Sequence, residues 1–159
     1  MRTALPTSEY VRAGDNRLYV CPFDVEHLRS LPWGDEPFDV FLVALGDAET
    51  DEVARRAIAE LVKLNNDWIE TFGVAAERLH DEIDEASVAH GRQTTVGDGR
   101  PMTAWHDDLT SDSAVIDYIR RGGHGSCDYK LVAILETDRV ASFVQDLKKR
   151  LPAALGEVR

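Results

Sequence analysis

The sequence has little positive charge, and this shortage limits what the chain can bind. Its 159 residues contain 18 Lys and Arg against 29 Asp and Glu, which gives a formal net charge of -11. A field of that sign repels a phosphate backbone, and the chain offers no Lys/Arg cluster to release the backbone's counterions. We therefore expect no direct nucleic-acid partner.

Long hydrophobic runs and cysteines are also scarce. No segment approaches the roughly 18 consecutive apolar residues that a membrane helix needs, and residues 1–16 lack the apolar core of a signal peptide. Cys21 and Cys127 lie far apart, and a domain with this much apolar sequence does not need a disulfide. We expect a cytoplasmic protein with two free thiols and no membrane partner.

Complete motifs for catalysis or cofactor binding are absent as well. The sequence has no Walker glycine loop, no GxGxxG after an expected strand and no paired metal-ligand histidines. It therefore predicts no cofactor, and a catalytic function has to be argued from scattered residues.

Hydrophobic residues make up 43% of the chain, and their spacing predicts an α/β domain. Apolar runs predict strands at 17–23, 38–46, 102–108 and 129–136, with 38–46 as the central strand. Helical periodicity predicts helices at 50–73, 75–89, 111–123 and 138–151. This order predicts a three-layer fold with a mainly parallel sheet of three to four strands, and with a long helical hairpin (50–89) inserted after the central strand. The single domain is expected over 17–152, between a loosely ordered N-terminal arm (1–16) and a frayed tail (153–159).

The expected hairpin has a strongly acidic surface. The polar face of its first helix includes Asp67 and Glu70, and the far side of its second helix carries a set of five carboxylates. Together with Trp33, these five could form a docking surface for a basic protein partner. The five are Glu77, Asp81, Glu82, Asp84 and Glu85.

Acidic residues also follow three of the expected strands. Asp47, Asp107 and Asp138 would meet at the carboxyl edge of a parallel sheet, where they could hold Mg²⁺ through oxygen ligands. His106 and Asp108, with Asp107, would then supply acid and base groups. The alternative is that these acids complement helix N-termini, with residues such as Ser111 acting as N-caps.

The segment RRGGHGSCDYKLVAIL, residues 120–135, places His124 three residues before Cys127. A cysteine nucleophile needs a base held by a third group, and this spacing alone does not supply one. The glycines fit a helix end, and a link from a helix back into a parallel strand lies at the edge away from the ligand crevice. We therefore interpret the segment as a turn.

Two functions remain open from the sequence. The first is a small acidic interaction module, either an adaptor or an inhibitor-like protein, that docks on a basic partner. The second is a metal-dependent enzyme of the phosphoryl-transfer type that uses the acidic carboxyl edge. The lack of a complete catalytic motif favours the first.

Overall fold

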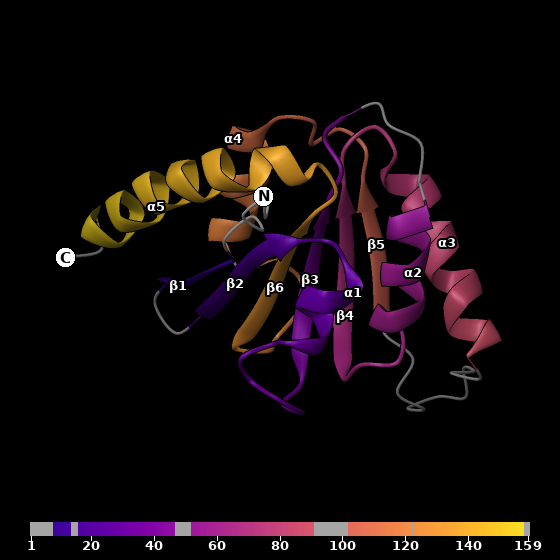
Figure 1. Cartoon of the computed structure of the whole chain (residues 1–159). Helices are drawn as coiled ribbons and strands as arrows, with labels where there is room; N and C mark the ends of the chain where they lie inside the picture. Colours follow the sequence, from indigo (N-terminus) through magenta and orange to yellow (C-terminus); the bar gives the residue numbers. More distant parts are fainter. Residues whose placement is uncertain (1–7, 14–15, 47–51, 91–101, 122, 158–159) are drawn as a thin grey trace, which may run out of the picture.

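The computed structural model describes residues 8–13, 16–46, 52–90, 102–121 and 123–157, which form an α/β fold with a mixed sheet. The described residues build six strands in the order β1-β2-β6-β3-β4-β5 (Figure 1). Only β1 is antiparallel to its neighbour. In chain order the strands are β1 (Glu9–Ala13), β2 (Asn16–Pro22), β3 (Phe38–Val43), β4 (Asn66–Phe72), β5 (Met102–His106) and β6 (Tyr129–Ile134).

The helices divide between the two faces of this sheet. One group contributes buried side chains to a core that includes Val40 and Leu42, and the other packs with Phe41 and Val43. Figure 1 shows α2 and α3 together near β4 and β5, with α4 and α5 on the other side of the molecule. The first group is α1 (Val25–Arg29), α2 (Glu52–Leu61) and α3 (Ala76–Ala89); the second is α4 (Asp112–Arg120) and α5 (Val140–Glu157), which follows the 3-10 turn η1 (Thr137–Arg139).

The prediction of three to four strands was wrong, because two further strands lie where none was expected. β1 falls inside the expected N-terminal arm and pairs with β2 along its whole length. β4 falls inside the expected helix 50–73. At the other end, α5 continues to Glu157, past the expected end of that helix. Residues 1–7, 14–15 and 158–159 lie outside the described residues.

The expected helical hairpin is therefore replaced by helix, strand and helix. The side chain of Asn66 donates hydrogen bonds to the carbonyl oxygens of Leu61 (2.6 Å) and Leu64 (3.2 Å), just where α2 ends. Asparagine is unfavourable inside helices because its side chain forms such local hydrogen bonds with the backbone. The prediction of a helix over 50–73 followed the helical spacing of the apolar residues instead. Because β4 is covered on both faces, its polar residue Glu70 is buried as deeply as Ile69.

The register of the parallel strands sets the position of every side chain on the α4 face. In one row across the sheet, Lys130 lies beside Asp39, which lies beside Trp68. In the next row toward the carboxyl ends, Phe41 lies beside Glu70, and the following row pairs Phe72 with His106. Two buried carboxylates thus lie one row apart on neighbouring strands.

Candidate metal centre

The candidate centre is built around Glu70, whose carboxylate is only 1% exposed. Taking an ionised carboxylate out of water is costly unless several donors replace the water. Burial alone would raise the pKa of Glu70, but hydrogen bonds from His124, Tyr118 and His106 lower that pKa below its ordinary value. Glu70 is therefore held as a carboxylate by its neighbours.

Two of these neighbours come from β5 and α4. His106, the last residue of β5, places Nε2 2.9 Å from Glu70 Oε1, and its ring stacks on Phe72 with 5.0 Å between centroids. Tyr118 comes from α4 and donates its hydroxyl hydrogen to the same Oε1. Burial, followed by the hydrogen bond to Glu70 and the negative charge of Glu70, raises the pKa of Tyr118 above its ordinary value.

The third neighbour, His124, comes from the segment that links α4 to β6. Its backbone N–H donates to Glu70 Oε2 (3.1 Å), and its Nδ1 lies 2.9 Å from Oε1. The preceding Gly123 has a φ of +65°, and a Cβ there would lie 2.6 Å from Glu70 Oε2. Only glycine lets the backbone come this close in this conformation. The His124 side chain itself is 58% exposed, so the centre has one side open to solvent.

The other half of the same link is held by a second buried carboxylate, Asp39. Its Oδ2 accepts hydrogen bonds from the Cys127 backbone N–H (3.0 Å) and from Lys130 Nζ (2.8 Å). Lys130 also donates to the carbonyl oxygen of Gly125 (3.3 Å), where a Cβ would collide with the Asp39 carboxylate. The link 123–128 is therefore fixed to the sheet at two points, Glu70 and Asp39.

The atoms around Glu70 match the donor set of a transition-metal site. Glu70, His106 and His124 each offer one ligand atom, and these three atoms lie within 4.8 Å of one another. Ligands bound at about 2.0–2.2 Å from an ion are roughly 3 Å apart, close to the 2.9 Å that separates each histidine nitrogen from Oε1. Two imidazoles and one carboxylate suit zinc, iron or manganese better than magnesium.

A second group of possible ligands, Asp39, Asp67 and Cys127, is unsuited to a cation. The Lys130 ammonium already lies 2.8 Å from Asp39 and would repel one. Burial and the Asp39 charge raise the pKa of Cys127 to about 12, so its thiol is protonated at neutral pH. This group is a structural ion pair.

Of the residues expected to bind metal or catalyse at the carboxyl edge, only His106 belongs to the centre. Asp107 and Asp108 are exposed in the turn after β5, and Asp138 is exposed in η1. None of the three belongs to a possible ligand group among the described residues. Asp47 lies outside those residues. The N-cap alternative holds at α4, where Ser111 Oγ accepts the Ala114 N–H (3.2 Å).

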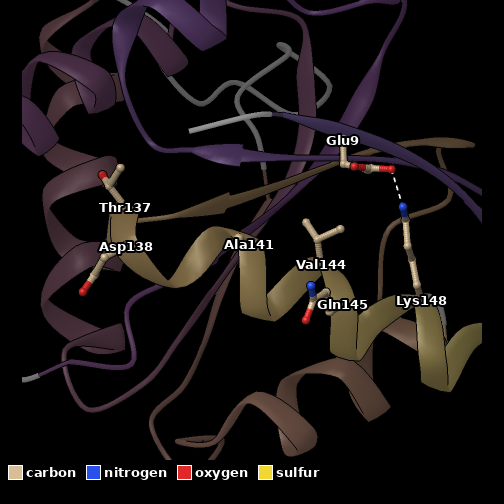
Figure 2. Close-up of a pocket in the computed structure, with 7 residues that line it drawn as sticks. All are labelled: Glu9, Thr137, Asp138, Ala141, Val144, Gln145 and Lys148. Atoms are coloured by element: carbon tan, nitrogen blue, oxygen red, sulfur yellow. Dashed lines mark hydrogen bonds and ion pairs between the residues drawn. The ribbon is translucent and has the colours of Figure 1, made fainter. Parts of the chain in front are cut away.

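Asp138 instead lines a groove between the start of α5 and β1 (Figure 2). The groove has a volume of about 510 Å³ and ends at an ion pair between Glu9 and Lys148. In Figure 2, Thr137 and Asp138 lie at the opposite end from that pair, with Val144 between them. The described residues that line it include no histidine or cysteine, and so they lack the nitrogen and sulfur ligands of a transition-metal site.

The sequence placed the link that carries His124 at the edge of the sheet away from the ligand crevice, whereas the structure places His124 against Glu70 of β4. The link ends at the amino end of β6, but its first half lies over the sheet, where His124 and His106 meet at one carboxylate. Glu70 itself was missed because it was assigned to the solvent side of a helix. A signal was available: Glu70 sits among Ile69, Thr71 and Phe72, residues that favour strands.

The residues of the expected docking surface are divided. Glu77, Asp81 and Glu85 are exposed on α3, whereas Glu82 and Asp84 are half-buried, and Asp84 accepts a hydrogen bond from Thr103 (3.2 Å). Trp33 does not belong to this surface, because its indole is packed in the core between the rings of Tyr19, Phe38 and Tyr129.

Comparison with known families places most of the chain in one of them. Residues 20–148 match the family described as a domain of unknown function (DUF7684), and the chain belongs to that family. The match spans β2 to α5 and thus includes Glu70, His106 and His124. No curated protein matches the chain. Within the described residues, no helix has both the length and the apolar content to cross a bilayer.

Proposed function

We propose that the chain is a metal-dependent enzyme whose transition-metal ion is held by Glu70, His106 and His124. The observation that carries this proposal is the convergence of two imidazole nitrogens, from β5 and the link after α4, on the buried carboxylate of Glu70 in β4. Three protein ligands leave coordination positions free, as catalytic sites require. The exposed side of His124 gives a substrate access to them.

A bound ion would supply a positive charge that polarises an oxygen atom of water or of a phosphoryl or carbonyl group. The residues of the chain would orient that ion: Glu70 through its fixed carboxylate, and His106 through its stacking on Phe72. This keeps the metal-dependent alternative from the sequence but moves it from Asp47, Asp107 and Asp138 to a nitrogen-rich site. A transition metal accordingly replaces Mg²⁺ in the proposal.

The test is metal-linked stability, with Zn²⁺ and Mn²⁺ as probes and Mg²⁺ as the comparison. At a hundredfold excess over Kd, an ion that binds only the folded chain adds about 2.7 kcal/mol, which raises Tm by roughly 5–10 °C in a chain of this size. The rise should disappear in His106→Ala and His124→Ala and persist in His90→Ala, because His90 is exposed at the end of α3. An equal rise in all three variants would contradict the proposal.

The acidic face of α3 supports a second proposal, the interaction module. Glu77, Asp81 and Glu85 point one kind of charge into solvent on an exposed helix face, and Trp105, 43% exposed on the neighbouring edge strand, adds an aromatic anchor. A basic protein would be the partner. Reversing the charges of these three residues should slow its association and flatten the salt dependence of the on-rate, with unchanged folding. A basic partner that binds the charge-reversed variant as fast as it binds the unaltered chain would refute docking on α3.

A further inference from the structure

The hydroxyl group of Tyr118 makes more contacts with the candidate centre than one hydrogen bond to Glu70. Its hydroxyl oxygen contacts Glu70 Oε1 and also lies 2.6 Å from Nδ1 of His124. It thus touches two of the three proposed ligand atoms. A residue that only oriented the carboxylate would need just the first of these contacts.

The two oxygens of Glu70 have different partners, and this difference locates the ion. Oε2 accepts the backbone N–H of His124, whereas Oε1 meets the side chains of His106, His124 and Tyr118. All three side chains therefore surround the same side of the carboxylate. An ion bound to Oε1, His106 Nε2 and His124 Nδ1 would lie beside the Tyr118 oxygen.

Packing holds the Tyr118 ring at this place. The ring lies edge-on to Phe41 (6.5 Å between centroids) and Phe72 (5.4 Å), and it leans against His106 (4.6 Å). When the lone pair of His124 Nδ1 turns to an ion, Nδ1 no longer serves as the partner of Tyr118. The phenol oxygen, held by these ring contacts, then remains beside the ion.

We infer that Tyr118 is the fourth protein ligand of the proposed metal centre, and that the centre selects iron(III). A phenolate and a carboxylate supply two hard, anionic oxygens, which favour a hard trivalent ion over a softer divalent one, and the two imidazoles complete a set that iron accepts. Four protein ligands around a six-coordinate ion leave two positions for water or substrate. On binding, the phenol O–H bond breaks, the oxygen donates its electron pair to the ion, and the proton goes to solvent. This inference rests on the proposed metal site and adds the identity of the ion.

The experiment uses the whole chain loaded with iron(III) from its nitrilotriacetate complex. A phenolate bound to iron(III) absorbs visible light by charge transfer to the metal, and resonance Raman excitation in that band shows phenolate vibrations. Both signals are expected in the unaltered protein. Tyr118→Phe should lose the band and weaken iron binding by tenfold or more, on the order of what a lost partner costs at a metal site. Tyr10→Phe should keep both, because Tyr10 is exposed on β1.

The readouts separate the two proposals. Iron binding that requires His106 but shows no phenolate signal overturns the assignment of Tyr118 and leaves the metal site intact. A phenolate signal that survives in Tyr118→Phe also overturns it. If neither zinc nor iron binds, the metal site falls, and Tyr118 with it. If Tyr118→Phe folds poorly, the absence of phenolate vibrations from the Raman spectrum of the unaltered, iron-loaded protein would still overturn the assignment.

Discussion

Asp39 and Glu70 are two carboxylates buried to the same 1% on one face of the sheet, yet their surroundings give them different roles. Asp39 faces a permanent cation, Lys130, which is itself buried. Glu70 faces two histidines and a tyrosine, and none of these carries a fixed positive charge. The comparison indicates that a buried acid with a lysine partner is a structural element, whereas one surrounded by metal-ligand side chains can accept a cation.

The link 123–128 connects the two carboxylates. Its Asp39 end is anchored by Lys130, and its Glu70 end presents His124. The structural pair therefore positions a ligand of the proposed centre. The different roles of the two ends can be tested by substitutions at the Asp39 end and at the Glu70 end of the link separately.

The largest effect is expected from Lys130→Met. Removing one partner of a buried pair leaves an uncompensated charge, which costs about 3–5 kcal/mol of unfolding free energy. The double variant Asp39→Asn with Lys130→Met should recover part of that loss, because no charge then stays buried. Urea unfolding of the four proteins in a double-mutant cycle measures the coupling. Additive losses would mean that the 2.8 Å contact contributes nothing.

The contrast between these two carboxylates also shows how far sequence reasoning reaches. Strong apolar runs such as 38–46 and 129–136 identified interior strands, because strands buried on both faces need continuous hydrophobic residues. β4 was not predicted as a strand, because it carries Asn66, Asp67 and Glu70 and because its apolar residues also match a helical period. Its burial depends on α3, α4 and the link 123–128, which are distant in sequence.

The candidate centre could be predicted only in fragments for the same reason. His106 was identified by its position at the carboxyl end of a strand, which is a local signal. His124 was correctly assigned to a link, but the position of that link relative to the sheet was not predicted, because a glycine-rich link can lie at an edge or fold over a sheet. The position of the link is decided by the close contacts of Gly123 with Glu70 and of Gly125 with Asp39. These contacts form only when β3, β4 and β6 are side by side.

A smaller loss of stability is expected for Glu70→Gln. The substitution keeps the shape but removes the charge that strengthens several hydrogen bonds, so we expect a loss of about 1.5–3 kcal/mol without metal. Unlike Lys130→Met, it should also abolish any rise in Tm produced by Zn²⁺. Thermal unfolding with and without the ion measures both effects. If Zn²⁺ stabilises Glu70→Gln as much as the unaltered chain, Glu70 is not a ligand.

Gly123→Ala should damage the Glu70 end of the link more than the Asp39 end. The new methyl group meets Glu70 and Phe41 at a φ of +65°, which disfavours L-residues by about 1–2 kcal/mol before any clash is counted. Metal affinity should fall with it, since His124 is the next residue. Gly34→Ala is the control: Gly34 has a similar φ of +61° but open space around its Cα. Equal metal affinity in both variants would show that the position of His124 tolerates movement of the link.

The smallest effect concerns the thiol at the Asp39 end. Burial and the nearby Asp39 raise the pKa of Cys127 from 9.0 to about 12, so the folded chain keeps this proton where the unfolded chain loses it. Stability from this group is complete below about pH 9 and is lost as pH rises toward 12.

At pH 8 we expect Cys127 to react slowly with a thiolate-specific reagent in the folded protein and quickly in urea. Cys127→Ala should unfold less readily than the unaltered chain only above pH 9, although buried Cys21, whose pKa is also raised, still contributes an alkaline loss in both proteins. Rapid labelling of Cys127 in the folded chain would show that the link opens at the Asp39 end without unfolding the sheet.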